Sequence, residues 1–175
     1  MALGPGRFAT EPTRERPDSP PRSYGVPRRG GTFIEWAHVI DRLATAEGYW
    51  IGTVTPAGRP HVVPVWGCFV GDDLYLETGA PDTIKNRNLA RNQNVWVHLD
   101  DVNDAVMVRG RGVELRSLDR DLGEALATAM RGKYKGYDPT PDSWDNGGMW
   151  RIDPHSVLAW KAMPTSTRWR FGETS

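Results

Sequence analysis

The stretch that decides the fold is residues 49–79, YWIGTVTPAGRPHVVPVWGCFVGDDLYLETG. Three runs rich in β-branched and aromatic residues follow one another here, separated by the turn signals PAG at 56–58 and GDD at 71–73. A Gly-Asp pair between two such runs is typical of a tight β-hairpin. The stretch therefore predicts an antiparallel meander of three strands.

The middle strand of this meander carries a proline. Pro64 has no backbone N–H, so it cannot donate to a strand ladder, and proline inside a strand normally marks an edge or a bulge. Two interpretations remain open. The proline either protects an edge strand from aggregation, or it breaks the ladder so that neighbouring backbone groups can face a ligand.

The rest of the chain extends the β pattern around short helices. Apolar residues at 3/4 spacing predict helices over 32–48, 80–92 and 118–134. Thr32 and Glu35 fit a capping box for the first helix, and Asp82 can cap the second, whose Ile84, Leu89 and Ala90 are predicted to face inward. Further strands are predicted over 94–101, 105–115, 148–154 and 156–162, with a bulge at Gly110–Gly112, and the last two complete the sheet.

These elements predict a mainly β (α+β) fold, a split antiparallel β-barrel of about six strands with short flanking helices. Residues 1–31 contain six prolines, five glycines and no apolar periodicity, so we expect a disordered tail there, or alternatively a functional arm. Residues 32–175 are expected to form the folded domain.

Composition excludes several classes of function. Formal net charge is zero and the sequence pI is about 6.9, which argues against nucleic acid or an anionic membrane as the partner. The single cysteine, Cys68, allows no internal disulfide, and no histidine pattern has metal-ligand spacing, so no metal is predicted. No run approaches the length of a membrane span and no secretory signal is apparent, so a cytoplasmic protein is expected.

A candidate anion site follows the third strand. Residues 76–89, LETGAPDTIKNRNL, predict a strand, a glycine turn and a helix start that carries Lys85, Arg87 and Asn88, with the hydroxyls of Thr78 and Thr83 nearby. Free N–H groups at a helix start, together with cationic side chains, suit a phosphate. The alternative is an ordinary solvated basic helix.

The order of these motifs resembles a known family. The chain resembles the pyridoxamine 5′-phosphate oxidase-like superfamily of FMN-binding split barrels, and more narrowly its actinobacterial branch that uses the deazaflavin coenzyme F420. The resemblance lies in a strand followed in order by GRPHxxPVW, GDDLYLETG and TxKxxNL. The resemblance covers residues 33–171. The excess of arginine over lysine, 18 to 4, is typical of a GC-rich genome and agrees with that branch.

The resemblance implies a cofactor site. The backbone of Val62–Trp66 would lie along the cofactor ring, Trp66 would form an aromatic wall, and Lys85 and Asn88 would bind the phosphate with help from Thr78 and Arg87. Arg59 and His61 would reach the cofactor or a dimer partner. The implied cofactor-binding residues are Arg59, His61, Val63, Pro64, Val65, Trp66, Thr78, Lys85, Arg87 and Asn88.

The resemblance also implies a function. It predicts a homodimer with the cofactor at the subunit interface, in which reduced F420 gives a hydride to an electron-poor double bond of a planar acceptor such as an enone or quinone. The alternatives are an FMN-binding oxidase or flavin reductase of the same fold, and a non-catalytic carrier. The proton donor stays open among His61, Tyr134, Tyr137 and solvent, and residues 132–148 form either a lid or a surface loop.

Overall fold

The computed structural model describes residues 5–18 and 22–172. Its strands are β1 (Thr13–Glu15), β2 (Tyr49–Val54), β3 (Pro60–Val70), β4 (Asp73–Glu77), β5 (Asn94–His98), β6 (Ala105–Leu115), β7 (Met149–Trp160) and β8 (Thr167–Arg170). Its helices are α1 (Trp36–Thr45), α2 (Ile84–Arg91) and α3 (Arg120–Lys133), with 3₁₀ turns at Arg22–Tyr24 and Met163–Thr165.

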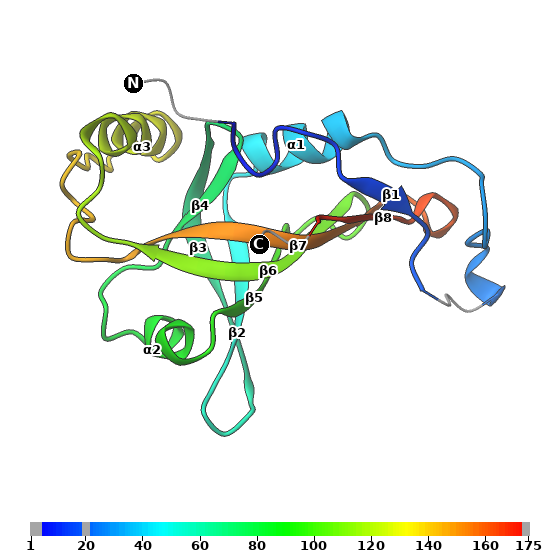
Figure 1. Cartoon of the computed structure of the whole chain (residues 1–175), viewed down its shortest axis with the longest axis horizontal. Coiled ribbons are helices and arrows are strands. Elements are labelled where there is room, and N and C mark those ends of the chain that lie inside the picture. The colour runs from blue at the N-terminus through cyan, green and yellow to red at the C-terminus, as the bar shows by residue number, and fades with distance from the viewer. Residues whose placement is uncertain (1–4, 19–21, 173–175) are drawn as a thin grey trace.

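Six strands close into a barrel. They are hydrogen-bonded in the order β7, β4, β3, β2, β5 and β6, every pair is antiparallel, and β6 returns to β7 over Ala105–Leu115. Strands β8 and β1 extend the sheet from β7 beyond the barrel (Figure 1). The predicted split barrel is therefore confirmed, and the predicted bulge appears as a shift in the β6–β7 register between Arg109 and Gly110.

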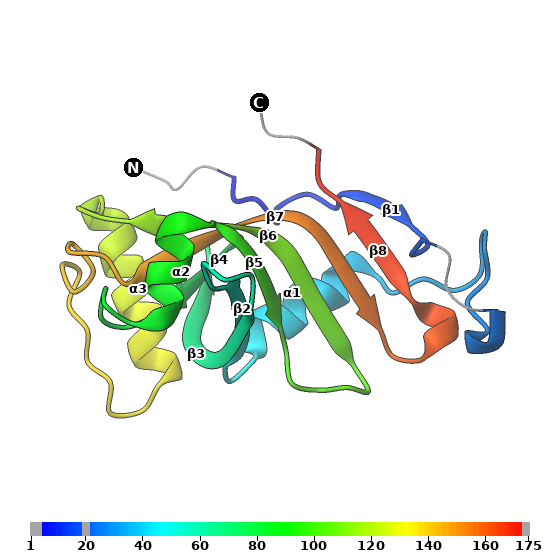
Figure 2. The same ribbon diagram turned by 90° about the horizontal axis from the view of Figure 1, so that it is seen from below.

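Two apolar clusters hold the helices on the barrel. The larger fills the barrel and reaches α1, and includes the fully buried Ile51, Val97 and Ile152. The smaller lies between α3 and the outer face of β3 and β4, around Leu126 and Met130. Figure 2 shows α3 and α2 near the same end of the barrel, with β8 and β1 at the other end.

The tight hairpin at 71–73 forms as predicted. Gly71 and Asp72 both have positive φ, 57° and 60°, which is the type I′ geometry that joins two twisted strands directly. Strand β3 then pairs with β4 from Trp66 to Val70, whereas from Pro60 to Val65 it pairs with β2. The ladder on one side of β3 therefore ends next to Pro64, and the described strands leave that edge open.

Three details of the helices and strands differ from the predictions. The first residue of α1 is Trp36 and its N-cap is Glu35, without a side-chain cap bond, so the capping box from Thr32 is wrong. Helix α2 is capped by Thr83 and not Asp82, and its Ile84 and Ala90 are exposed while Asn86, Asn88 and Leu89 are buried. The two strands predicted over 148–162 are one continuous strand, β7, because Pro154 lies at the β6 bulge, where a missing N–H is tolerated.

The N-terminal residues also differ from the expected disordered tail. In the described part of 1–31, Phe8 is 1% exposed and packs against Trp36, while β1 pairs with β8. Arg7 contacts Asp73 through its backbone N–H at 2.8 Å and its guanidinium at 3.2 Å. Composition alone missed this because one buried aromatic and a three-residue ladder produce no periodic pattern.

Candidate functional site

A groove of about 860 Å³ opens between the end of α1, strands β2, β3 and β4, and the start of α2. Its floor is the part of β3 that has an open edge, since Pro64, Val65 and Trp66 all line the groove. The glycine turn after β4 and Lys85 of α2 form one end. The groove thus combines the proline-broken strand and the helix start, which the sequence places about twenty residues apart.

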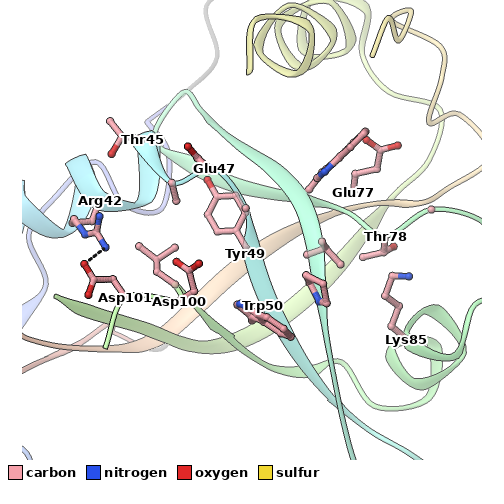
Figure 3. A pocket seen from close by; sticks show the side chains of 17 residues that line it. Arg42, Thr45, Glu47, Tyr49, Trp50, Glu77, Thr78, Lys85, Asp100 and Asp101 are labelled. Atoms are coloured by element: carbon pink, nitrogen blue, oxygen red, sulfur yellow. Dashed lines mark ion pairs between the residues drawn. The ribbon is translucent and has the colours of Figure 1, made fainter. Parts of the chain in front are cut away.

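Lys85 is a cation without a counter-ion. Neither a hydrogen bond nor an ion pair joins its ammonium to the described residues, and partial burial lowers the pKa of Lys85 below its ordinary value. Figure 3 shows its side chain extending from α2 towards Thr78. Near it, the hydroxyl of Thr83 is buried and has no partner at the first turn of α2. An anion at this end would pair with Lys85 and with the free helical N–H groups.

Asn86 holds the turn beside Lys85 in place. Its side-chain oxygen accepts bonds from the Thr78 hydroxyl at 2.5 Å and from the Trp150 indole at 3.0 Å. Its side-chain nitrogen donates to the carbonyls of Gly79 at 3.1 Å and Ala80 at 2.7 Å. A single buried amide therefore joins α2, the turn and the barrel wall, and Thr78 contributes to the wall rather than offering a free hydroxyl.

An aromatic wall stands on the other side of the open edge. Trp66 is 48% exposed and stacks on Tyr134, with ring centroids 4.7 Å apart and planes 14° apart. The Tyr137 ring lies 5.2 Å from Trp66, and its hydroxyl donates to Glu77 at 2.6 Å. Burial and this carboxylate both raise the pKa of Tyr137. The wall is thus a rigid apolar surface suited to a flat ring.

The segment 132–148 is a packed part of this wall. Tyr134 exchanges two hydrogen bonds with the backbone of Gly67, at 2.8 and 2.9 Å, and Trp144 is 2% exposed in the smaller apolar cluster. The segment is therefore neither the lid nor the plain surface loop of the two interpretations. It packs as a support for Trp66.

Acidic groups gather at the end of the groove away from Lys85. Glu47, Asp100 and Asp101 line it there, with Arg42 pairing to Asp101 at 3.6 Å (Figure 3). Because Arg42 also contacts Asp104 at 3.3 Å, its charge is already shared between two carboxylates. An anionic ligand group is consequently favoured at the Lys85 end and disfavoured at the opposite end.

The structure separates the ten predicted cofactor residues into two groups. Those that line the groove are Pro64, Val65, Trp66, Thr78 and Lys85.

The other five lie elsewhere. Arg59 and His61 belong to the β2–β3 hairpin, Val63 packs against the barrel core, and the Arg87 guanidinium donates to the Asp82 carbonyl. Asn88 is 3% exposed and donates to Thr53 at 3.0 Å, so it anchors α2 to the barrel.

The last strand of the chain has a packing role. Arg168 pairs with Glu15 and Asp18, and Trp169 is fully buried beside Trp36, so both residues pack the β1–β8 extension. Residues 5–18 and 22–172 contain no cluster of three or more metal-ligating side chains and no helix with the length and apolar character needed to cross a bilayer.

Two features of the site escaped sequence reasoning. No role was predicted for Asn86, and its burial was signalled only by its i, i+3 relation to Leu89. A second hollow of about 480 Å³ runs along β2, β3 and β5, where Val62 and Trp96 are 50% and 42% exposed. Alternation in 94–98 places Trp96 outside, which was the available signal for an open apolar face.

Similar structures share the fold. A conserved hypothetical protein from Mycobacterium tuberculosis aligns with a TM-score of 0.59 and 20% identity, over 78% of this chain and 90% of that one. A protein described as an F420 reductase aligns with a TM-score of 0.51 and 23% identity, over 67% and 94%. A pyridoxamine 5′-phosphate oxidase-related, FMN-binding protein from Nostoc punctiforme aligns with a TM-score of 0.54 and 19% identity, over 79% and 91%.

At these identities the likenesses show the fold alone. No curated protein matches the chain in sequence. The family described as pyridoxamine 5′-phosphate oxidase, however, matches residues 38–161, which include all six barrel strands from β2 to β7, while β1 and β8 lie outside the match. The match extends over more than half of the chain, which therefore belongs to the pyridoxamine 5′-phosphate oxidase family.

Proposed function

We propose that the groove binds the deazaflavin coenzyme F420 and that the protein transfers a hydride from the reduced cofactor to an electron-poor double bond of a planar acceptor, such as an enone or quinone. One observation carries this proposal. The unpaired ammonium of Lys85 and the open edge of β3 line the same groove, so a phosphate and a flat ring can be held side by side. The F420 reductase among the similar structures supports the choice of cofactor.

The residues present fit such a cofactor. Lys85 and the first N–H groups of α2 suit a phosphate, since each is a donor without an acceptor in the described structure. The backbone next to Pro64 suits the polar edge of a ring, and Trp66 bounds that ring. A groove of about 860 Å³ has the size of typical cofactor sites.

The division of labour follows from these contacts. The bound cofactor supplies the hydride. Lys85 fixes the phosphate end, the open edge of β3 orients the ring plane, and the wall of Trp66 with Tyr134 and Tyr137 keeps water from one side. The acidic end around Asp100 and Asp101 disfavours a reversed cofactor, because the phosphate would meet carboxylates there.

FMN is the second candidate cofactor. The same phosphate end and open edge suit it, and an FMN-binding protein is among the similar structures. FMN would make the protein an oxidase or a flavin reductase, and either cofactor bound without turnover would make it a carrier.

A titration distinguishes these candidate cofactors. The dialysed protein is titrated with F420 and with FMN, followed by the quenching of its tryptophan fluorescence. We expect tighter binding of F420, and a loss of about tenfold to a hundredfold in Lys85→Met because a charge-assisted bond is removed. Arg87→Met is the matched control, since Arg87 is on the same helix but bonds to the Asp82 carbonyl outside the groove. Equal affinity of Lys85→Met and wild type contradicts the proposed site.

We also propose that the protein is a homodimer. The hollow along β2, β3 and β5 is mainly apolar and exposes Val62 and Trp96, the kind of surface that a second copy covers in obligate dimers. The β2–β3 hairpin borders this hollow through Pro60. A partner seated there places the hairpin residues Arg59 and His61 at the subunit interface, which gives a role to two residues that lie outside the groove of their own chain.

A further inference from the structure

Another cavity, distinct from the hollow along β2, β3 and β5, has a volume of about 540 Å³ and adjoins the groove. We call it the side chamber; its lining includes Thr45, Glu47, Trp66, Lys133 and Lys135. Three of these residues, Thr45, Glu47 and Trp66, also line the groove, so the two spaces are continuous. Figure 3 shows Thr45 and Glu47 across the groove from Thr78 and Lys85. The side chamber therefore lies beyond the ring end of the groove and away from the phosphate end.

Lys133, the last residue of α3, brings an ammonium group to this chamber. Its Nζ donates to the Gly67 carbonyl at 2.8 Å and to the Tyr49 hydroxyl at 3.1 Å. Tyr49 donates its own proton to the Leu43 carbonyl at 2.6 Å, so it acts only as an acceptor towards Lys133. No carboxylate of the described chain lies within ion-pair distance of Lys133, and one of its three N–H groups has no protein acceptor there.

This arrangement supports both protonation states of the amine. A neutral amine keeps two N–H groups, which are enough for Gly67 and Tyr49, so the loss of the third proton breaks neither bond. An ordinary structural lysine instead has a carboxylate or solvent that favours the charged form, whereas Lys133 has, beside its two acceptors, only the rings of Tyr49 and Tyr134, whose centroids lie 4.5 and 5.4 Å from Nζ.

We propose that Lys133 is the acid group of the reductive reaction, which binds the carbonyl oxygen of the acceptor in the side chamber and gives it a proton. The inference rests on the proposed function and assigns the proton donor of that same site. Hydride addition to the β-carbon of an enone forms a C–H bond and breaks the C=C π bond. The electron pair of that bond forms a new π bond between the α-carbon and the carbonyl carbon, and the C=O π pair moves to the oxygen. The oxygen takes the third proton of Lys133, which leaves an enol and a neutral amine that solvent protonates again.

The surroundings of Lys133 support this role. Burial lowers the pKa of Lys133 to about 8, near a working pH, which is where a general acid is most effective. Burial also raises the pKa of Cys68 on β3 and of Tyr134 to about 12, and it raises the pKa of Tyr49 on β2, so these neighbours stay neutral in that range.

Two other charged side chains line the side chamber. Glu47 and Lys135 carry opposite charges at its exposed border. The Glu77 carboxylate on β4 interacts electrostatically with Cys68 and accepts a hydrogen bond from Tyr137. Lys133 is thus the group in contact with the chamber whose charge changes near pH 8.

The test is a single-turnover measurement. Protein loaded with reduced F420 is mixed with menadione, and the rate of cofactor oxidation is followed from pH 6 to 10. We expect the wild-type rate to fall about tenfold per pH unit above about 8, because the protonated form of the acid is lost. Lys133→Met is expected to be about a hundredfold slower and to show no such fall. Lys133→Arg keeps a cation and its hydrogen bonds but holds its proton, so it should also lose the pH break.

Lys161→Met is the control, because Lys161 is exposed after β7 and lines neither the groove nor the side chamber, and it should keep the wild-type rate and pH profile. An unchanged rate and profile in Lys133→Met overturns the inference and leaves the proposed function standing. A wild-type protein that binds neither F420 nor FMN overturns both.

A second measurement does not require activity. The chain has four lysines, so protein labelled at lysine Cε gives four side-chain NMR signals, and the signal missing in Lys133→Met belongs to Lys133. That signal is expected to titrate near pH 8. Titration at the ordinary lysine value of about 10.4 overturns the inference.

Discussion

Replacing Asn86 by alanine tests how the phosphate end of the groove is built. The substitution removes the acceptor of two buried donors, the Thr78 hydroxyl and the Trp150 indole, and the donor of the Gly79 and Ala80 carbonyls. Residues 79 and 80 are exposed, so water can replace the amide at those two carbonyls. The Trp150 indole has no such replacement, because residue 150 is 2% exposed, whereas the Thr78 hydroxyl keeps a second acceptor, the Gly148 carbonyl, at 3.3 Å.

The magnitude follows from those two donors. A buried donor without an acceptor costs about 1–3 kcal/mol, which applies to the Trp150 indole, and the loss of the shorter Thr78 bond adds about 0.5–1.5 kcal/mol. The better helix propensity of alanine returns about 0.5 kcal/mol. A net loss of about 1–4 kcal/mol lowers the Tm of a chain of this size by roughly 2–16 °C. The affinity for F420 should fall as well, because the turn that positions Lys85 is released.

Thermal unfolding followed by circular dichroism measures this loss. Asn103→Ala is the control, since Asn103 is exposed in the β5–β6 connection and should leave the Tm unchanged. Thr78→Val removes one of the two donors together with its need for an acceptor, so it should cost clearly less than Asn86→Ala. An Asn86→Ala protein that unfolds at the wild-type temperature refutes the reasoning.

Three further outcomes are expected. Phe8→Ala should lower the free energy of unfolding by about 3–5 kcal/mol, while Tyr24→Ala, at a 55% exposed position, should not. Equal stability of the two variants would support the expected disordered tail instead. Because burial raises the pKa of Cys68 to about 12, its thiol should react with Ellman's reagent at pH 8 roughly a thousandfold more slowly than a free cysteine. Unfolding in urea should abolish the difference in rate. Rapid labelling of the folded protein would contradict this by showing an accessible thiolate. Val62→Asp should give a monomer in light scattering whereas Val102→Asp should not, and a dimeric Val62→Asp protein would exclude the apolar hollow as the interface.

The barrel was predictable from the sequence because its signals are local. Alternating apolar residues, the Gly71-Asp72 turn and the position of Pro64 each determine backbone geometry within a few residues, and all three appear in the structure as expected. The open edge at Pro64 follows from the missing N–H of proline, which needs no knowledge of distant segments.

The site was predictable only in part, for a physical reason. Lys85 and Val65 share a groove because β4 returns the chain across β3, and a strand, a turn and a helix in succession indicate this. Whether a polar side chain of α2 points to solvent, to the barrel or to the turn depends on the rotation of the helix on the barrel. That rotation directs Asn88 to Thr53 and Asn86 to the turn, and sequence spacing did not fix it.

Lys133 shows the remaining difficulty. It is the last residue of a helix and lies 48 residues after Lys85, and only the packing of α3 on β3 brings its ammonium to Gly67 and Tyr49. The same long-range packing places Phe8 in the core. Contacts of this kind depend on the finished barrel and leave no local pattern.

The most direct test of the central claim compares phosphorylated and unphosphorylated ligands. Wild type and Lys85→Met are titrated with F420 and with its ring-bearing fragment that lacks the phosphate and tail. If a ring on the open edge of β3 and a phosphate at Lys85 belong to one ligand, the wild type prefers F420 by about tenfold to a hundredfold, and Lys85→Met loses most of that preference while still binding the fragment. A preference for F420 that survives unchanged in Lys85→Met would contradict the account.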